Sequence, residues 1–192
     1  PLRKGVSAMK KKRARRKFSA KRDRLLPSER QAAQAKIEEN LFALENFTAH
    51  EHYFVYLSFK SEVSTANIIS RLYNLGKKVY VPKIVGGRML AVKISGGMAL
   101  NAYGIAEPKD TVEAEKIDVC ITPLLAVDKS LHRVGYGKGY YDRFFAEHAC
   151  VKIGVCFAAQ RYKKNFETDG GDVPLDYAVT EKGTEKRQVE NV

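Results

Sequence analysis

Short apolar runs alternate with segments of helical periodicity along this chain. Runs of this kind predict buried strands, which we expect at residues 53–57, 79–81, 89–94, 117–122, 152–157 and 177–180. Pro82 is expected to end the second strand, because proline cannot donate to a strand ladder. Strands that alternate with helices form a mainly parallel sheet with helices on both faces. The chain is therefore expected to have an α/β fold.

Helical spacing and capping signals predict the helices, at residues 10–26, from Pro27 or Ser28 to about Leu44, from Ser64 or Thr65 to Gly76, and from about 139 to 149. Pro27 either ends the first helix or begins the second, because proline fits the first turn of a helix and not its interior. Ser28 and Gln31 have the spacing of a capping box. The expected architecture is a three-layer, Rossmann-like single domain.

The net charge of +12 is concentrated at one end of the chain. Residues 1–22 contain eleven Lys and Arg and no acidic residue, whereas the remainder carries 23 basic and 22 acidic residues. Such a segment is either a solvated tail, a targeting signal or an arm that binds a polyanion, and small phosphates count as polyanions. We assign residues 1–9 to a leader or disordered basic tail and residues 10–192 to one domain.

The apolar runs and the cysteines limit the compartment. No run approaches the roughly 20 consecutive apolar residues that a membrane span needs. Cys120, Cys150 and Cys156 form no CxxC pair, which is typical of reduced thiols in the cytosol. We expect a cytoplasmic protein, with a mitochondrial address as the alternative, that acts as a monomer and binds neither membrane nor nucleic acid.

A glycine-rich segment, Arg133 to Asp142 (RVGYGKGYYD), lies between an expected strand and an expected helix. Alternating glycines let backbone N–H groups approach an anion closely, and the following helix directs its positive end toward the same place. Lys138 and Arg133 add full positive charges, and Asp142 is a carboxylate suited to Mg²⁺. A flexible turn is the alternative reading, since the segment matches neither GxxxxGK[ST] nor GxGxxG.

The whole segment resembles the R-x-G-x-G-K-G-Y-Y-D signature of the 5-formyltetrahydrofolate cyclo-ligase family. Four further elements resemble the same family in the same order. They are the basic pattern of Lys11, Arg15 and Arg22; residues 56–65 with an E-x-x-T pattern; residues 103–108 with G-I-x-E-P; and the C-terminal stretches 157–160 and 172–181. The resemblance extends over nearly the whole chain from Lys11 onward.

The resemblance implies an enzyme that cyclises 5-formyltetrahydrofolate to 5,10-methenyltetrahydrofolate with ATP as co-substrate and Mg²⁺ as cofactor. In this family the formyl oxygen attacks the γ-phosphate, ring closure follows, and ADP and phosphate leave. No enzyme nucleophile is required, so the protein positions its substrates and stabilises charge.

The resemblance also implies residue roles. The catalytic residues would be Lys138, Arg133 and Tyr140, and the metal ligands Asp142 and Asp172. ATP contacts would come from Lys11, Lys12, Arg13, Ala14, Arg15, Arg133, Val134, Gly135, Tyr136, Gly137, Lys138, Gly139, Tyr140 and Tyr141. Folate contacts would come from Arg15, Leu57, Glu62, Tyr103, Tyr136, Gly137, Lys138, Gly139 and Tyr140. Glu62 suits the adjacent N–H groups of a pterin or the amines nearby.

Two positions depart from the family pattern. Leu124 and Leu131 stand where the family commonly has glycine. If either backbone has a positive φ, leucine is strained there by about 1–2 kcal/mol. The alternatives to the enzyme are a nucleic-acid or phosphoprotein-binding domain, a different small-molecule kinase or ligase, and a folate-binding relative without turnover.

Overall fold

The computed structural model describes residues 8–188 except 95–96, 101–103, 105 and 110. Its centre is a seven-stranded sheet in the order β11-β10-β9-β6-β1-β2-β3. The strands are β1 (His52–Val55), β2 (Lys78–Val85), β3 (Arg88–Lys93), β6 (Val119–Thr122), β9 (Val151–Val155), β10 (Tyr177–Thr180) and β11 (Gly183–Lys186). Five of these strands, from β2 to β10 across the sheet, run parallel, and β3 and β11 add antiparallel edges.

The order of the parallel strands determines where a ligand can bind. When the five parallel strands are numbered in chain order, their order across the sheet is 2-1-3-4-5. The connection from β1 to β2 leads toward one edge of the sheet, and the connection from β6 to β9 leads toward the other edge. In a sheet of this kind the carboxyl ends of the two strands at the switch point border a crevice. The crevice is therefore expected beyond Val55 and Thr122, where β1 and β6 end.

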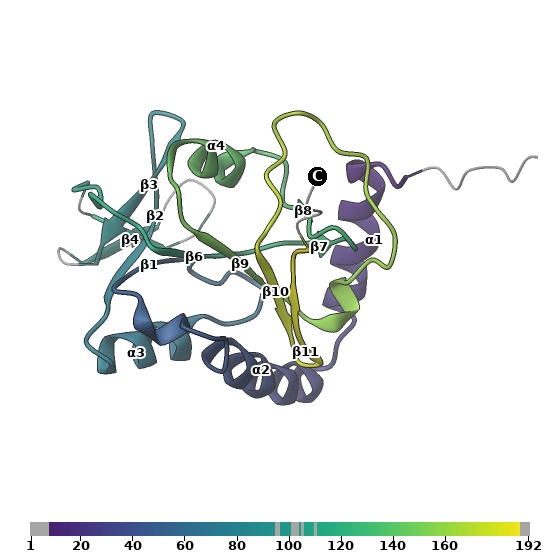
Figure 1. Ribbon diagram of the computed structural model, residues 1–192, viewed down its shortest axis with the longest axis horizontal. Coiled ribbons are helices and arrows are strands. Elements are labelled where there is room, and N and C mark those ends of the chain that lie inside the picture. Colours follow the sequence, from purple (N-terminus) through teal and green to yellow (C-terminus); the bar gives the residue numbers. More distant parts are fainter. Residues whose placement is uncertain (1–7, 95–96, 101–103, 105, 110, 189–192) are drawn as a thin grey trace, which may run out of the picture.

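Helices cover both faces of the sheet, which confirms the predicted fold class (Figure 1). Helices α2 (Pro27–Phe42) and α3 (Ala66–Asn74) pack through Ile37 and Leu72 against Tyr53 and Val55 of β1. On the opposite face α4 (Tyr140–Glu147) brings Phe144 to 4.6 Å from Phe54, ring centroid to ring centroid. The alternation of β1 side chains between the two faces thus anchors both helical layers.

Helix α1 (Lys11–Asp23) lies beside the sheet rather than on it (Figure 1). Its buried residues Ala14 and Phe18 pack against Ala126, Val134 and Phe166. Ala126 and Val134 belong to the short ribbon β7 (Ala126–Val127) and β8 (Arg133–Val134) that leads into the glycine-rich segment. The helix therefore lies directly against the base of that segment. None of the helices in the described part of the chain is long and apolar enough to cross a membrane.

The remaining elements are small. Strands β4 (Met98–Leu100) and β5 (Ala106–Pro108) form an antiparallel pair. Single 3-10 turns lie at η1 (Phe47–Ala49) and η2 (Ala158–Gln160). Of the assigned leader, residues 1–7 lie outside the described residues, whereas Met9 pairs with Phe166.

Two local predictions are wrong. Pro82 does not end β2, which continues to Val85. The pairing of β2 with β1 stops at Tyr80, so Pro82 has only β3 as a neighbour and its missing N–H is tolerated at an edge. The second helix begins at Pro27, and its capping contact is Glu29 Oε2 with the N–H of Leu26, at 2.8 Å, rather than a Ser28–Gln31 pair.

Leu131 meets the condition under which strain was expected at one of the two replaced glycines. Its φ is +61°, in the left-handed region, whereas Leu124 is not among the residues with positive φ. The turn is held by the buried carboxylate of Asp128, whose Oδ1 accepts from the N–H groups of Ser130 and His132, both at 2.9 Å. The Leu131 side chain is buried with Leu124 and Leu175.

Candidate active site

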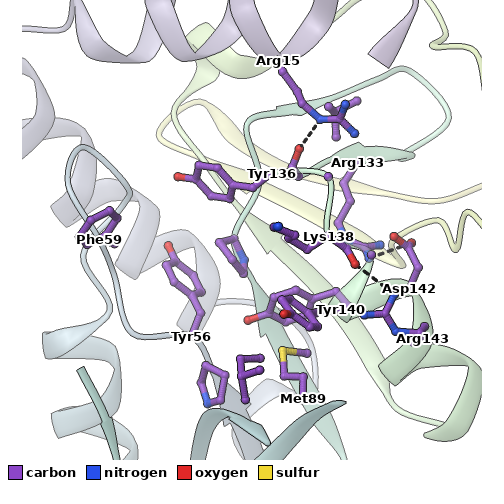
Figure 2. Close-up of a pocket in the computed structure, with 18 of the residues that line it drawn as sticks. Arg15, Tyr56, Phe59, Met89, Arg133, Tyr136, Lys138, Tyr140, Asp142 and Arg143 are labelled. Carbon is purple, nitrogen blue, oxygen red and sulfur yellow. Dashed lines mark hydrogen bonds and ion pairs between the residues drawn. The ribbon is translucent and has the colours of Figure 1, made fainter. Parts of the chain in front are cut away.

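A cavity of about 840 Å³ opens at the carboxyl ends of β1 and β6, at the switch point of the sheet. Helix α1, the glycine-rich segment and α4 form one side of it, and β2 and β3 the other (Figure 2). The predicted site residues that line it are Lys11, Arg15, Leu57, Glu62, Arg133, Val134, Gly135, Tyr136, Gly137, Lys138, Gly139, Tyr140, Tyr141, Asp142 and Asp172. The structure thus brings together residues that are far apart in the sequence.

The alternating glycines of the segment meet different constraints. Gly137 has φ +98°, and a Cβ there would lie 3.2 Å from the guanidinium carbon of Arg15. Gly139 has φ +70°, and a Cβ there would lie 2.9 Å from Nη1 of Arg143. Gly135 has neither a positive φ nor an atom within 4 Å of its Cβ position. Gly137 and Gly139 therefore allow two arginines to close over the segment.

Cationic groups surround the start of α4. Arg143 Nη1 donates to the carbonyl of Lys138 at 3.0 Å, and Arg15 Nε donates to the carbonyl of Gly135 at 2.9 Å. Lys138 extends into the cavity (Figure 2). The first N–H groups of a helix have no partner within the helix, and its dipole favours negative charge there. This part of the cavity is suited to an anion such as a phosphate chain.

Arg133 holds the acidic side of the site together. Its side chain is only 4% exposed, and Nη2 donates to Asp142 Oδ1 at 2.9 Å. Nη1 donates to the carbonyl of Val173 at 2.8 Å, and the guanidinium carbon lies 4.9 Å from the ring centroid of Phe145. The N–H of Val173 in turn donates to Asp142 Oδ1 at 3.2 Å. Arg133 therefore fixes Asp142 beside the loop that carries residues 172 and 173.

Lys11 forms the second contact to this acidic side. Its Nζ lies 2.6 Å from Asp172 Oδ1 and 2.7 Å from Asp169 Oδ2. Burial alone would lower the pKa of Lys11, but the hydrogen bonds and charges of the two carboxylates raise it above its usual value. Lys11 therefore stays protonated, and its charge is neutralised by the carboxylate predicted to bind metal.

Two carboxylates of the cavity, Asp142 and Asp172, form a donor set that fits a magnesium ion. Asp142 accepts a hydrogen bond from the N–H of Val173, and Asp172 directly precedes Val173 in the chain. Both carboxylates line the cavity. Among the described residues, no three His, Cys, Asp or Glu side chains gather into a group that could hold a metal ion without help. Mg²⁺ is commonly bound by one or two carboxylates together with substrate phosphates and water. Two carboxylates beside a phosphate-binding segment fit that requirement.

Glu62 organises the opposite end of the cavity. Its Oε2 accepts from the N–H of Phe59 at 2.9 Å, and its Oε1 accepts from the Tyr136 hydroxyl at 2.8 Å. Arg22 Nη1 donates to the same hydroxyl at 3.4 Å. Burial raises the pKa of Glu62 despite these hydrogen bonds, and burial also raises the pKa of Tyr136. A half-buried carboxylate of this kind suits N–H donors of a ligand.

Not every predicted residue reaches the cavity. Lys12 and Arg13 are exposed, and Ala14 is buried against Ala126; none of the three lines the cavity. Tyr103 lies outside the described residues. The ATP contacts assigned to residues 12–14 and the folate contact assigned to Tyr103 remain predictions.

Several lining residues were missed by the sequence analysis: Tyr56, Phe59, Lys60, Pro82, Ile84, Met89, Glu107, Pro123, Arg143 and Asp169. Five of them had a signal in the sequence. Arg143 directly follows the ten-residue signature, Glu107 lies within the G-I-x-E-P element, and residues 56, 59 and 60 lie within the element at 56–65. Pro82, Ile84 and Met89 had none, because they come from β2 and β3, which border the cavity only as a result of the strand order in the sheet.

Residues 7–181 match the family model described as the 5-formyltetrahydrofolate cyclo-ligase family. The chain belongs to the 5-formyltetrahydrofolate cyclo-ligase family. A relative named 5-formyltetrahydrofolate cyclo-ligase from Haemophilus influenzae is 31% identical over 76% of this chain and 83% of its own length. The relative of that name from Escherichia coli K12 is 33% identical over 66% of this chain and 75% of its own.

Solved structures agree with the family. The 5,10-methenyltetrahydrofolate synthetase of Aquifex aeolicus is 28% identical, covers 95% of both chains and superposes with a TM-score of 0.81. The synthetase of that name from Mycoplasma pneumoniae is 25% identical over 90% of this chain and 99% of its own, with a TM-score of 0.75. The family recognised from the sequence is confirmed, and this member of the cyclo-ligase family is an enzyme.

Proposed function

We propose that the chain catalyses the ATP- and Mg²⁺-dependent cyclisation of 5-formyltetrahydrofolate to 5,10-methenyltetrahydrofolate, with release of ADP and phosphate. One observation carries the proposal: the anion-binding segment 135–139 and the carboxylate of Glu62 face the same cavity. A nucleotide and a second substrate with N–H donors can therefore meet in it. Because the chain belongs to the cyclo-ligase family, we take the nucleotide to be ATP and the second substrate to be 5-formyltetrahydrofolate.

The phosphates would lie between α1 and the start of α4. Lys11, Arg15 and Lys138 line the same cavity as the glycine-rich segment. Lys11 and Arg15 are four residues apart on one helix and so lie on the same face. Two cations of the basic N-terminal region thus line the cavity, which favours a small phosphate over nucleic acid as their partner.

Asp142 and Asp172 would hold Mg²⁺ against the phosphates, and the ion would neutralise charge on the transferring group. Arg133 keeps Asp142 in place through the 2.9 Å contact and so acts as a positioning residue. Lys138 would stabilise the charge of the γ-phosphoryl group. Tyr140, at the first position of α4, would support the formyl group beside it.

The proposed reaction has two bond-forming steps. The formyl oxygen attacks the γ-phosphorus and ADP leaves, which gives a phosphorylated formyl group on N5. The neighbouring N10 amine then attacks the same carbon and loses its proton, and phosphate leaves with the former formyl oxygen as the ring closes. Positioning and charge stabilisation supply the catalysis.

The buried thiols are unsuited to a nucleophilic role. Cys156 is 1% exposed, and burial raises its pKa to about 12. Burial likewise raises the pKa of Cys120 well above its usual value, so both thiols stay protonated at neutral pH. A mechanism without an enzyme nucleophile agrees with this environment.

An absorbance assay tests the proposal. Purified protein is mixed with 5-formyltetrahydrofolate and Mg-ATP, and the near-ultraviolet band of the methenyl product is followed. Lys138→Ala and Asp142→Ala should each lower kcat by roughly 100-fold or more, as removal of one charge-stabilising group commonly does, with an unchanged circular dichroism spectrum. Lys17→Ala, an exposed residue of α1 that does not line the cavity, is the control. Near-normal rates in either site variant would contradict the assignment.

A further inference from the structure

A second cavity of about 390 Å³ adjoins the first. Both cavities are lined by Arg15, Phe59, Lys60 and Tyr136, so these residues form the boundary between them. The second cavity also reaches Arg16 and Arg22 on α1. We call it the α1 groove; it continues the active site along that helix.

Helix α1 runs the length of both cavities. Lys11, Arg15 and Arg22 are separated by four and seven residues, which places them along one face of the helix. Lys11 contacts Asp172 at the acidic end of the site, and Arg15 contacts the carbonyl of Gly135. Arg22, which contacts Tyr136, lies roughly 16 Å along the helix from Lys11, at 1.5 Å per residue. The α1 groove therefore lies beyond the phosphate-binding part, at the end of the site that contains Glu62.

The α1 groove carries an excess of positive charge. Arg15, Arg16, Arg22 and Lys60 line it, against one acidic residue, Asp23. Asp23 is already engaged, because the Ser61 hydroxyl donates to its Oδ1 and Arg22 Nε lies 3.5 Å from the same atom. The Ser61 hydrogen bond is the main cause that lowers the pKa of Asp23, and the charge of Arg22 adds to it. The remaining cations are suited to an anionic ligand.

The boundary residues suit an aromatic linker. Tyr136 is 55% exposed although its hydroxyl is fixed by Glu62, so its ring offers a flat surface to the cavity. Phe59 faces the same boundary, and its ring lies 5.0 Å from Nζ of Lys60. The opposite end of the main cavity, near Ile84, carries the carboxylate of Glu107 instead. A ligand with an anionic arm is therefore favoured to direct that arm toward the α1 groove.

We propose that the α1 groove binds the glutamate carboxylates of the folate substrate, with its aminobenzoyl ring against Tyr136 and Phe59. This inference rests on the proposed function. In this arrangement Glu62 serves the amines next to the aminobenzoyl ring. Arg16 is the decisive residue, because it lines the α1 groove and not the main cavity.

The test compares two substrates that differ only in the arm. For 5-formyltetrahydrofolate, Arg16→Gln should raise KM roughly threefold to tenfold, as loss of one charge-assisted contact implies, and leave kcat unchanged. For the uncharged amide of 5-formyltetrahydropteroate, which has neither the glutamate nor a free carboxylate, the same substitution should leave KM unchanged. The double variant Arg16→Gln/Lys60→Gln should enlarge the difference for the first substrate, and added salt should reduce it.

Lys17→Gln is the matched control, since it removes the same charge from the next position of α1 without touching the α1 groove. It should leave the KM of both substrates unchanged. Equal effects of Arg16→Gln on the two substrates, or none on either, would overturn the assignment of the α1 groove while wild-type turnover persists. Absence of wild-type turnover with both substrates would instead refute the proposed function.

Discussion

The Nζ of Lys11 lies 2.6 Å from Oδ1 of Asp172, across a sequence separation of 161 residues. A similar pair, Arg133 with Asp142, lies at 2.9 Å on the same side of the cavity. Each pair joins a cation assigned to ATP with a carboxylate assigned to Mg²⁺. We therefore expect nucleotide and metal to compete with these contacts inside the protein, and each ligand should release the partner that the other needs.

The first prediction concerns ATP without metal. Asp172→Asn removes the carboxylate that neutralises Lys11, so free ATP should bind more tightly than to the wild type, by about threefold to tenfold, because a like charge near the phosphates is lost. The gain in affinity that Mg²⁺ gives the wild type should shrink in this variant. Isothermal titration calorimetry with and without Mg²⁺ measures both effects.

Asp169→Asn is the matched control for this experiment. It also removes a partner of Lys11, at 2.7 Å, but Asp169 is exposed and is not an assigned metal ligand. It should tighten free ATP slightly and retain the Mg²⁺ effect. If Asp172→Asn bound free ATP no better than the wild type, competition between Asp172 and ATP for Lys11 would be refuted.

The second prediction concerns the two glycines that differ in their surroundings. Gly137→Ala forces a Cβ to 3.2 Å from the Arg15 guanidinium at φ +98°, so it should raise the KM for ATP about tenfold, as a strain of 1–2 kcal/mol implies. Gly135→Ala adds the same methyl group where nothing lies within 4 Å, and it should cause a clearly smaller loss. Steady-state kinetics with varied ATP checks the order; equal losses would contradict it.

The sequence was sufficient for the elements that carry strong local signals. Strands such as β1 and β6 are apolar, and β10 was expected at 177–180, as found. The glycine-rich segment was expected between the strand at 117–122 and a helix from about 139, and it lies between β6 and α4 in the chain, although the short strand β8 at its start was not predicted. These signals are local, since apolar runs and turn glycines depend on the chain within a few residues.

The parts that were missed depend on long-range contacts. Strand β11 reads GTEK and is an edge strand, so it has no apolar pattern to detect. Pro82 could stay within β2 only because β1 has already ended beside it. The pairing of Lys11 with Asp172 and the α1 groove arise from the packing of α1, which no local pattern specifies.

The third prediction uses the raised pKa of Glu62. Because its pKa in the folded protein lies above the usual 4.5, the folded state holds a proton that the unfolded chain has lost, and stability falls as pH rises through this window. Glu62→Gln removes the titration. The difference in Tm between variant and wild type should therefore shift in favour of the variant from about pH 4 to about pH 7.

Thermal unfolding followed by circular dichroism measures this difference. Glu39→Gln, an exposed position of α2, controls for the general loss of a negative charge. A difference for Glu62→Gln that stays constant with pH would show that the carboxylate has no raised pKa in the folded protein.

The fourth prediction is that at position 131 the glycine variant is more stable than the alanine variant, which is the reverse of the usual order. Both Leu131→Ala and Leu131→Gly lose a buried side chain, which typically costs 2–5 kcal/mol. Only glycine also relieves the backbone, whose φ is +61°. Leu131→Gly should thus be more stable than Leu131→Ala by about 1 kcal/mol.

Leu124, buried in the same cluster but without a positive φ, supplies the comparison. There Leu124→Ala should be the more stable of the pair, because glycine loses more backbone freedom on folding. Urea unfolding of the four variants decides the sign at each position. If the alanine variant were the more stable at both positions, the turn after Asp128 would relax without strain. If the order is reversed only at position 131, the chain retains a backbone conformation suited to the family glycine and uses the leucine side chain to fill the core.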